Sequence, residues 1–523
     1  MQIIDTATLT ETSTRELSPD AVSNIYCGLD CAVTYEIRDT LKAQIETDLP
    51  CVQETYRNAL AKQAPIMEMS MRGFLVDEGN RQISLRRMEA DLASLEEGFN
   101  FILKEGLNHV MNWRSPMQLK AFFYNTLGLK PVKARNAQGE FTPTINREAL
   151  EKLSVNFYAE LFCNYILAMR DLAKQIGFLK TEIDEDNRIR CSFNIAGTNT
   201  GRLSSSMNEF GTGTNLQNVS RNLRFPFIAD PKKIIVNVDL EQADSRNVGA
   251  IIWNLFVEDE GEERAGAYLD ACESGDLHTT VARMAWPELK WSADRKEWRA
   301  TADQLAYRDD SYRQLAKKLG HGTNYLGQPR TMARHTKTET RLIEEFQARY
   351  FAAFPLIKRW HQWIVEQVTT YGFITTQFGR RRYFFDRADA ASTHREATAY
   401  EPQSMTAHEI DMGYLNLWRN MPEAELLVQV HDSITLQVPY ANLIDRMPRL
   451  LDLMRVELEL KKSRLFTVPL DAKVGWNWGD VEYSDGKDGT PKRPIRNLHG
   501  LDKWKFNETR VPPSYKLRLR DYL

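Results

Sequence analysis

Two segments with the pattern of β-strands each lead to an aspartate, although they lie far apart in the chain. Ile234 to Val238 is apolar except for Asn237, and Asp239 follows it directly. Residues 427–438 alternate on both sides of His431-Asp432, as in a β-hairpin whose turn presents the acid. Each aspartate alone is commonly explained by turn propensity or helix capping. The pair is more informative, because a fold that brings both strand ends together would place two carboxylates in one site.

A helical segment between the two strands carries cations at four-residue spacing. Arg313, Lys317 and His321 fall on one helix face, where like charges repel weakly. A solvated cationic face is the commoner explanation of this pattern. However, the helix runs into two glycines that permit close approach of a ligand, and a triphosphate would turn the repulsion into attraction. Two carboxylates with a cationic helix are the groups that a reaction on a metal-bound polyphosphate requires, so we predict a nucleotidyl transferase.

The composition is that of an ordinary globular protein. The chain has 523 residues, of which 42% are hydrophobic and 27% charged, with a formal net charge of -3. This charge argues against a uniformly basic coat but not against a basic cleft. The cysteines form no CxxC pairs, and there is no signal-peptide pattern or membrane-length apolar run. We therefore expect a reduced, cytoplasmic protein with no membrane partner.

Periodicity predicts the fold class. Residues 80–110 have helical spacing, Ser115-Pro116 has the sequence of a helix start, and residues 133–144 have the composition of a polar loop. Helices are expected to continue to about residue 180 and over most of residues 241–370. The prediction is an α+β fold, in which a small antiparallel sheet is flanked by two helical regions.

Ordered motifs surround the residues described so far. They are Glu68–Asp77, Thr200–Ser206, Asn215–Asn218, Asp239–Arg246, Gly275–Thr279, Arg313–Tyr325, Phe378–Tyr383, Arg395 with Pro402–Ser404, and Gln429–Asp432. In this order they resemble the motifs of family A DNA polymerases, the group of bacterial DNA polymerase I and many phage replicases. The resemblance spans roughly residues 26–480. It implies a right-hand polymerase with a palm, helical fingers and a thumb, and template-directed DNA synthesis from a primer.

The resemblance also implies a division of the chain. Residues 1–45 would be a disordered start and an exonuclease-domain remnant, and residues 46–190 the palm lead-in and thumb. Residues 191–240 and 379–486 would form the palm, and residues 241–378 the fingers. Residues 487–523 would be a basic C-terminal extension.

Roles for single residues follow from the same resemblance. Asp239 and Asp432 would bind two Mg²⁺ ions, with Mn²⁺ as a substitute, and the Leu240 carbonyl would be a further ligand. The expected dNTP-binding residues are Gln242, Asp244, His278, Arg313, Lys317, His321 and Tyr325. The expected contacts to primer–template DNA are Arg202, Asn215, Gln217, Asn218, Arg246, Arg395, Gln403 and His431. A separate exonuclease and other replication proteins are candidate partners.

Three positions depart from the family pattern. His321 stands where Phe or Tyr is usual, Asp244 replaces a Glu, and Ser433 follows Asp432 where Glu is common. We expect these changes to affect nucleotide selectivity and not to abolish catalysis, because two acids suffice for the metals.

Both ends of the chain carry further signals. Tyr26 to Asp30 resembles the last motif of the family's 3′–5′ exonuclease, without the Asp-x-Glu of the first metal site, so we expect an inactive remnant packed on the palm. By analogy we expect a phage or mobile-element source and a bacterial host cell. The last 37 residues hold ten Lys/Arg against four acids. They predict an extended arm that either solubilises the protein or binds DNA or a partner.

Two alternative functions stay open at this stage. One is a single-subunit RNA polymerase, which shares the two-aspartate chemistry but is disfavoured by the motifs at residues 200–206 and 429–432. The other is an inactive DNA-binding replication subunit, which would not need Asp239, Asp432, Arg313 and Lys317.

Overall fold

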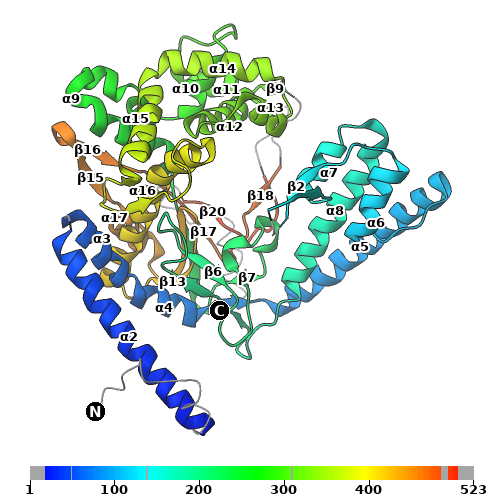
Figure 1. Ribbon diagram of the computed structural model, residues 1–523, viewed down its shortest axis with the longest axis horizontal. Coiled ribbons are helices and arrows are strands. Elements are labelled where there is room, and N and C mark those ends of the chain that lie inside the picture. Colours follow the sequence, from blue (N-terminus) through cyan, green and yellow to red (C-terminus); the bar gives the residue numbers. More distant parts are fainter. Residues whose placement is uncertain (1–17, 49, 137–138, 308–309, 485–492, 505–523) are drawn as a thin grey trace. The chain divides into compact units, whose positions relative to one another are not determined.

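The computed structural model describes residues 18–504 except 49, 137–138, 308–309 and 485–492 (Figure 1). The chain forms two compact units. We call Met1–Lys62 with Asn247–Met405 the helical unit, and Gln63–Arg246 with Thr406–Leu523 the sheet unit. Among the described residues, no helix is long and apolar enough to cross a membrane.

A five-stranded antiparallel sheet organises the sheet unit, with the strand order β13-β14-β8-β17-β20. The strands are β8 (Lys233–Leu240), β13 (Glu425–Val430), β14 (Ser433–Pro439), β17 (Leu470–Gly475) and β20 (Asp502–Lys503). β8 lies in the middle, and its residues Ile234, Ile235 and Val236 are fully buried. β-branched side chains favour this extended, packed environment. The strands predicted at residues 236–238 and 428–438 are thus confirmed.

A helical bundle forms a second core of the sheet unit. It consists of α5 (Glu78–Leu107), α6 (Pro116–Lys120), the π-helix η2 (Ala121–Thr126), α7 (Arg147–Leu153) and α8 (Phe157–Leu179). Phe99, Phe122 and Phe162 meet edge to face in its core, a favoured geometry for aromatic pairs. The Ser115 side chain accepts a hydrogen bond from the Gln118 backbone N–H at the start of α6, which confirms the predicted cap.

Shorter elements complete the sheet unit. One three-stranded sheet has the order β4-β1-β7, with β1 at Phe74–Val76, β4 at Arg188–Ile189 and β7 at Phe227–Ile228. The other elements are α4 (Gln63–Arg72), β5 (Ser192–Asn194), β6 (Ser204–Ser206), η3 (Leu216–Asn218), η4 (Arg221–Leu223), α17 (Leu443–Met454), β15 (Glu457–Leu460), η6 (Lys461–Ser463) and β16 (Arg464–Thr467).

The loop predicted at residues 133–144 is a hairpin instead. β2 (Lys133–Arg135) pairs with β3 (Phe141–Pro143). The Asn136 side chain closes the turn by accepting from the Glu140 backbone N–H, and Gly139 has a φ of 84°. The turn composition was visible in the sequence, but strands of three residues are too short to show an alternating pattern.

The helical unit confirms the helices expected over residues 241–370. It contains α2 (Pro19–Thr47), α3 (Pro50–Ala61), most of α9 (Ala243–Glu273), α10 (Leu277–Ala285), η5 (Arg295–Glu297), α11 (Trp298–Ala302), α12 (Tyr312–Asn324), α13 (Pro329–Thr336), α14 (Thr340–Ala353), α15 (Pro355–Tyr371) and half of α16 (Ala391–Asn420). Two hairpins join them, β9 (Leu305–Tyr307) with β10 (Asp310–Ser311) and β11 (Phe373–Thr375) with β12 (Arg381–Tyr383).

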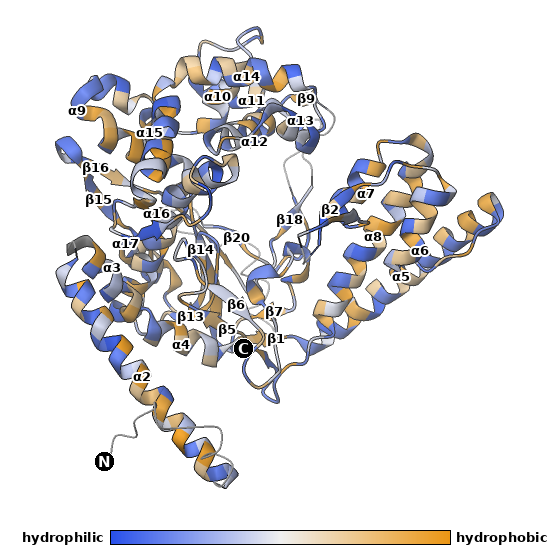
Figure 2. Ribbon diagram, viewed as in Figure 1, coloured by the Kyte–Doolittle hydropathy of each residue, from blue (hydrophilic) through white to orange (hydrophobic). Residues whose placement is uncertain are grey.

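The N-terminal helix departs from the prediction. Apolar and polar residues alternate along α2 (Figure 2), yet none of its residues is buried. The expected packing of this helix on the palm, which belongs to the other unit, stays a prediction. The predicted disordered start falls partly on residues 1–17, which lie outside the described residues, and partly on α2, which begins at Pro19.

Part of the basic C-terminal segment is built into the sheet unit. β19 (Pro494–Arg496) pairs with β18 (Glu482–Tyr483), and β20 pairs with β17. Leu501 and Trp504 are buried. Residues 493–504 thus contradict the predicted extended arm, because β19 pairs with β18, β20 joins the five-stranded sheet, and Leu501 and Trp504 are buried. The rest of the predicted arm, residues 487–492 and 505–523, lies outside the described residues.

Candidate active site

The sheet brings the two predicted aspartates to one end. Asp239, near the end of β8, pairs with Ser433 on β14 and with Asp471 on β17. Asp432 lies in the turn between β13 and β14, and its carbonyl oxygen accepts a hydrogen bond of 3.1 Å from the Leu240 backbone N–H. The two strand ends that carry Asp239 and Asp432 therefore meet.

The turns beside these acids have unusual backbone conformations. His431 has a φ of 55° and Gln242 a φ of 58°, in the left-handed region that non-glycine residues seldom occupy. The Gln429 side-chain amide donates to the His431 carbonyl oxygen at 2.6 Å, and the Ser433 hydroxyl donates to Val430 O at 3.0 Å. These contacts hold the turn that carries Asp432, and conformations of this kind cluster at functional sites.

Burial and neighbouring acids favour the protonated form of both carboxyl groups. Burial raises the pKa of Asp239 to about 7, with further contributions from Asp432 and Asp471. The pKa of Asp432 is raised by burial and then by Asp244, and its backbone hydrogen bond opposes the rise. Partly buried carboxyl groups whose pKa is raised by neighbouring acids create a negative potential that a cation would relieve.

The donor set fits a hard divalent cation. Carboxylate and carbonyl oxygens are the ligands that Mg²⁺ prefers, together with water and substrate phosphates. In the described part of the chain, no three His, Cys, Asp or Glu side chains cluster closely enough to form a complete protein cage. A cation here would thus be held by Asp239, Asp432 and non-protein oxygens, which is the usual situation for Mg²⁺.

A polar network connects the turn at Asp432 to residues predicted to contact DNA. The Gln217 side-chain amide donates to Gln429 O at 3.0 Å and to Leu203 O at 3.1 Å. Asn215 accepts from the Ser205 hydroxyl at 2.7 Å. The network places Asn215 and Gln217 beside the strand that leads to Asp432.

The remaining predicted residues of the sheet unit have varied surroundings. Arg202 lies 3.6 Å from Asp244, which also accepts from the Thr406 hydroxyl at 3.0 Å. Asn218 ends η3. Arg246 is buried and donates through Nε to the Glu241 carbonyl oxygen at 3.1 Å. A buried guanidinium of this kind is committed at least partly to the fold.

The predicted cations of the helical unit share the exposed side of α12. Lys317 and His321 are exposed and Arg313 is half-buried, whereas the buried side carries Leu315, Ala316, Leu319, Gly320, Thr323 and Asn324. Ser311 and Gln314 form a capping box at the helix start, which satisfies two backbone N–H groups. At the other end, the rings of His321 and Tyr325 meet edge to face at 4.8 Å.

His278 joins this group from α10. Its pKa is lowered to about 4, first by burial and then by Arg313, with smaller contributions from Lys317 and His321. The imidazole is therefore neutral near pH 7 and carries one N–H donor. The structure thus brings four residues predicted for phosphate and sugar binding onto α10 and α12.

Sequence reasoning gave no role to Asp276, which holds Arg313. The Asp276 carboxylate accepts from Arg313 Nε at 2.6 Å and Nη2 at 3.1 Å, and from the Thr279 hydroxyl at 2.7 Å. The pKa of Asp276 is lowered to about 2, because these hydrogen bonds and the positive charges outweigh its burial. The sequence did place Asp276 in the motif Gly275–Thr279. Its pairing with Arg313 could not be predicted, because that pairing depends on the packing of α10 against α12.

Two predicted DNA contacts lie on α16 in the helical unit. Arg395 is exposed and Gln403 is half-buried. The structure therefore divides the predicted residues into a sheet-unit group around Asp239 and Asp432 and a helical-unit group on α10, α12 and α16.

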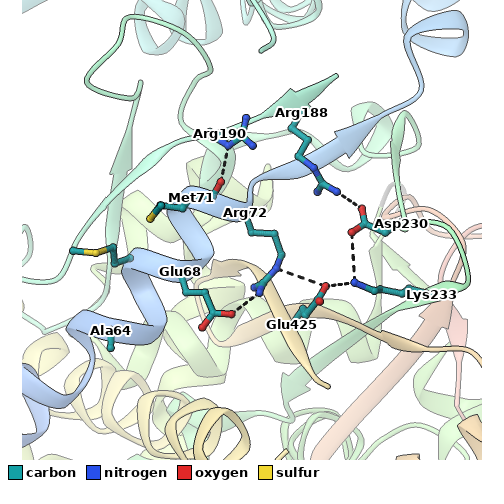
Figure 3. Close-up of a pocket in the computed structure, with 10 residues that line it drawn as sticks. Ala64, Glu68, Met71, Arg72, Arg188, Arg190, Asp230, Lys233 and Glu425 are labelled. Atoms are coloured by element: carbon teal, nitrogen blue, oxygen red, sulfur yellow. Dashed lines mark hydrogen bonds and ion pairs between the residues drawn. The ribbon is translucent and has the colours of Figure 1, made fainter. Parts of the chain in front are cut away.

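A cleft of about 630 Å³ in the sheet unit (Figure 3) is lined by none of the residues predicted to bind metal, dNTP or DNA. Its floor is a chain of ion pairs in which Arg72 lies 3.6 Å from Glu425, Glu425 2.5 Å from Lys233, and Asp230 2.6 Å from Arg188. Lys233 begins β8, whereas Asp239 lies six residues further on. At about 3.3 Å per residue, the cleft is roughly 20 Å from the aspartate pair. Its charges tie α4 to the sheet.

Comparison with known proteins identifies the family. The family model described as DNA polymerase family A matches residues 82–480, and the chain belongs to this family. It is 27% identical over 431 residues to "DNA polymerase I, thermostable" of Thermus filiformis, covering 78% of this chain and 46% of the relative. It is 26% identical over 431 residues to DNA polymerase I of Bacillus caldotenax, covering 80% of this chain and 45% of the relative. The chain thus spans about half the length of these curated relatives.

A solved structure confirms the fold class. The chain is similar, with a TM-score of 0.62 and 22% identity, to the POL domain of Pol1 from M. smegmatis in complex with DNA primer-template and dNTP. The similarity covers 80% of this chain and 69% of that one. The predicted α+β fold of the right-hand polymerase type is therefore confirmed.

Proposed function

We propose that this chain is a template-directed DNA polymerase that adds deoxynucleotides to a primer 3′-OH by two-metal-ion nucleotidyl transfer. The observation that carries the proposal is the meeting of Asp239 and Asp432 at one end of the sheet. Two partly buried carboxylates on strand ends that meet, in a member of DNA polymerase family A, need a function that offsets the repulsion from neighbouring acids, and cation binding supplies one.

Asp239 and Asp432 would hold Mg²⁺, with Mn²⁺ as a substitute and the Leu240 carbonyl as a further ligand. When bound, the cations would acidify the primer hydroxyl and neutralise charge on the triphosphate. The chain's own contribution is to keep both carboxylates in place. The Leu240 N–H does so through Asp432 O, and Gln429 does so through the His431 carbonyl.

The helical unit would bind the triphosphate. Arg313 uses two N–H groups on Asp276, so three of its five donors are left for phosphate oxygens. Lys317 offers a point charge on the same helix face, and neutral His278 offers an N–H. His321 and Tyr325 would contact the sugar and base. From the sheet unit, Gln242 would line the phosphate pocket and Asp244 would face the ribose 2′-position.

Primer–template DNA is the proposed partner, and it would be read through the minor groove. Arg202, Asn215, Gln217, Asn218, Arg246, Arg395, Gln403 and His431 are the candidate contacts. Every base pair offers acceptors in that groove, so amide and guanidinium donors there would test the shape of a pair and not its sequence. The POL domain of Pol1 from M. smegmatis, in complex with DNA primer-template and dNTP, supports this choice of partner.

The decisive experiment is extension of a labelled primer by the purified chain beside Asp239→Asn and Asp432→Asn. Each substitution keeps the side-chain shape but removes a metal-binding charge, so extension should fall at least about 1000-fold. Asp445→Asn, which changes an exposed acid on α17, is the matched control and should extend at the wild-type rate. Extension by either site variant at more than a few per cent of wild type would refute the assignment. Faster use of ribonucleotides than deoxynucleotides would favour RNA synthesis.

We further infer that α2 is the remnant of a 3′–5′ exonuclease domain, because Tyr26 and Asp30 on this helix match its last motif. We further propose that this chain has no 3′–5′ exonuclease activity of its own. Magnesium-dependent shortening of a single-stranded 3′ end by the pure protein, absent in Asp30→Asn, would contradict it.

A further inference from the structure

A buried polar circuit lies under the C-terminal turn of α12. The Asn324 side chain donates through Nδ2 to the Tyr268 hydroxyl at 2.8 Å and accepts through Oδ1 from the Tyr350 hydroxyl at 3.0 Å. The two hydroxyl oxygens lie 3.2 Å apart. His361 Nε2 lies 2.8 Å from the Asn324 carbonyl oxygen. Helices α9, α14 and α15 thus each contribute one side chain to the last residue of α12.

The circuit is sealed from solvent. Tyr268, Asn324 and Tyr350 are at most 3% exposed, and His361 is 7% exposed. The ring of Phe354 meets those of Tyr268 at 5.0 Å and Tyr350 at 5.4 Å. In such low-dielectric surroundings a satisfied hydrogen bond is strong and an unsatisfied group is costly.

His361 and Tyr350 each have one protonation state near neutral pH. Burial lowers the pKa of His361 to about 4 and raises the pKa of Tyr350 well above its ordinary value. The imidazole is therefore neutral, and because a carbonyl only accepts, its Nε2–H donates to Asn324 O. Each hydroxyl has one proton, so all three edges of the triangle are satisfied only when the donations run one way around it. Removing either hydroxyl breaks the circuit.

Asn324 lies at the end of α12, a helix with one side buried in the protein core and the other side carrying the predicted nucleotide-binding residues. Its side chain belongs to the buried side, which is otherwise apolar or small, with Thr323 beside it. The next residue, Tyr325, ends the helix and packs on His321. An apolar contact at residue 324 would tolerate small rotations of this turn, whereas directional hydrogen bonds from three helices fix its rotation and height.

We infer that Tyr268, Tyr350 and His361, acting through Asn324, are positioning residues that set nucleotide selection by holding the turn with His321 and Tyr325. This inference rests on the proposed function and extends it, because none of the four side chains has to touch the nucleotide. Arg313 and Lys317 lie further back on α12, so phosphate binding depends less on the circuit.

The test compares Tyr350→Phe, Tyr268→Phe and the double variant with wild type in primer extension. In Tyr350→Phe the buried Asn324 Oδ1 loses its donor. We expect KM for the deoxynucleotide to rise about fivefold, the factor equivalent to about 1 kcal/mol, with kcat changed less than about twofold. The preference for deoxynucleotides over ribonucleotides should change by at least about threefold. Because either substitution breaks one circuit, the double variant should resemble the single variants and not multiply their effects.

These readouts separate positioning from simple loss of stability. Destabilisation lowers the amount of active enzyme, so it reduces apparent kcat and leaves KM and discrimination unchanged. Tyr124→Phe is the matched control, because its hydroxyl donates to Thr144 O in the helical bundle of the sheet unit. It should keep wild-type KM and discrimination. If Tyr350→Phe does not fold, Tyr268→Phe, which leaves the Tyr350–Asn324 bond in place, decides the question.

Two outcomes would overturn the inference, and they differ. Wild-type KM and discrimination in the folded tyrosine variants, with normal extension by wild type, would refute the positioning role alone. Absence of extension by both wild type and Tyr124→Phe would refute the proposed function and the inference together.

Discussion

Replacing Asp276 with Asn tests how Arg313 is held. The side chains of both residues are less than one quarter exposed, and the carboxylate receives two hydrogen bonds from the guanidinium. The pKa of Asp276 falls from 3.8 to about 2 on folding, and each pH unit between the two values corresponds to 1.36 kcal/mol. The ionised carboxylate thus contributes about 2 kcal/mol to the free energy of unfolding.

The sign of the pH dependence follows from the lowered pKa. The contribution is fully present above pH 3.8, the unfolded value, and is lost as the pH falls through about 2. Urea unfolding followed by tryptophan fluorescence should show Asp276→Asn about 2 kcal/mol less stable than wild type at pH 7. The difference should shrink as the pH drops below 3.8. Asp303→Asn is the control: Asp303 pairs with Arg299 at a site about half exposed, and its loss leaves the bonds from Arg299 and Arg313 to Asp276 in place. This variant should cost less than about 1 kcal/mol.

Activity gives a second readout of the same substitution. Without Asp276, Arg313 loses its bidentate anchor and must be ordered by the substrate, so KM for the deoxynucleotide should rise about threefold or more. A fall in KM would refute this reasoning, because it would mean that Asp276 competes with phosphate for Arg313. Equal stability of Asp276→Asn and Asp303→Asn at pH 7 would refute the energetic part.

Three smaller predictions concern stability. Glu401→Gln should remove one pH dependence: burial raises the pKa of Glu401 from 4.5 to about 8, so the contribution of the neutral carboxyl group to stability is fully present below pH 4.5 and is lost as the pH rises through 8. Urea melts of the variant should therefore change less with pH over this range than those of wild type. Gly500→Ala should cost about 1–3 kcal/mol in thermal unfolding, because a Cβ there would collide with the Asn497 side chain and Gly479 O; Gly106→Ala, which meets nothing within 4 Å, should be neutral or stabilising. Ser311→Ala should lower stability by about 1 kcal/mol by removing the cap of α12, and an unchanged melting temperature would contradict that role.

Local patterns were sufficient to predict the elements that carry the candidate site. β8 and the hairpin at Asp432 follow from apolar runs and alternation, and the cationic side of α12 follows from helical spacing. That Asp239 and Asp432 lie close together could be predicted only because the proposed reaction on a metal-bound polyphosphate needs two carboxylates in one site. The motif resemblance then supplied the expected fold, because spacing alone does not say which strands are neighbours.

Contacts between distant residues explain most of what the sequence did not show. Asp276 meets Arg313 because α10 packs on α12, and Asn324 meets Tyr268 and Tyr350 because α9 and α14 converge beneath it. No periodicity encodes such pairings. The buried Asn324 gave no signal, since a polar residue near a helix end is ordinarily solvated or a cap.

The C-terminal pairing of β20 has a consequence for how the boundary of this domain should be defined. The family match ends at residue 480, but β20 lies beyond it and covers the outer edge of β17 at Lys473 and Val474. A chain cut at that boundary would expose backbone N–H and C=O groups along β17, and an uncovered edge strand is a template for pairing with other chains. Asp502 and Lys503 therefore protect this edge of the sheet from pairing with other chains. A shortened version of this protein that omits these residues should therefore aggregate more readily than the full chain.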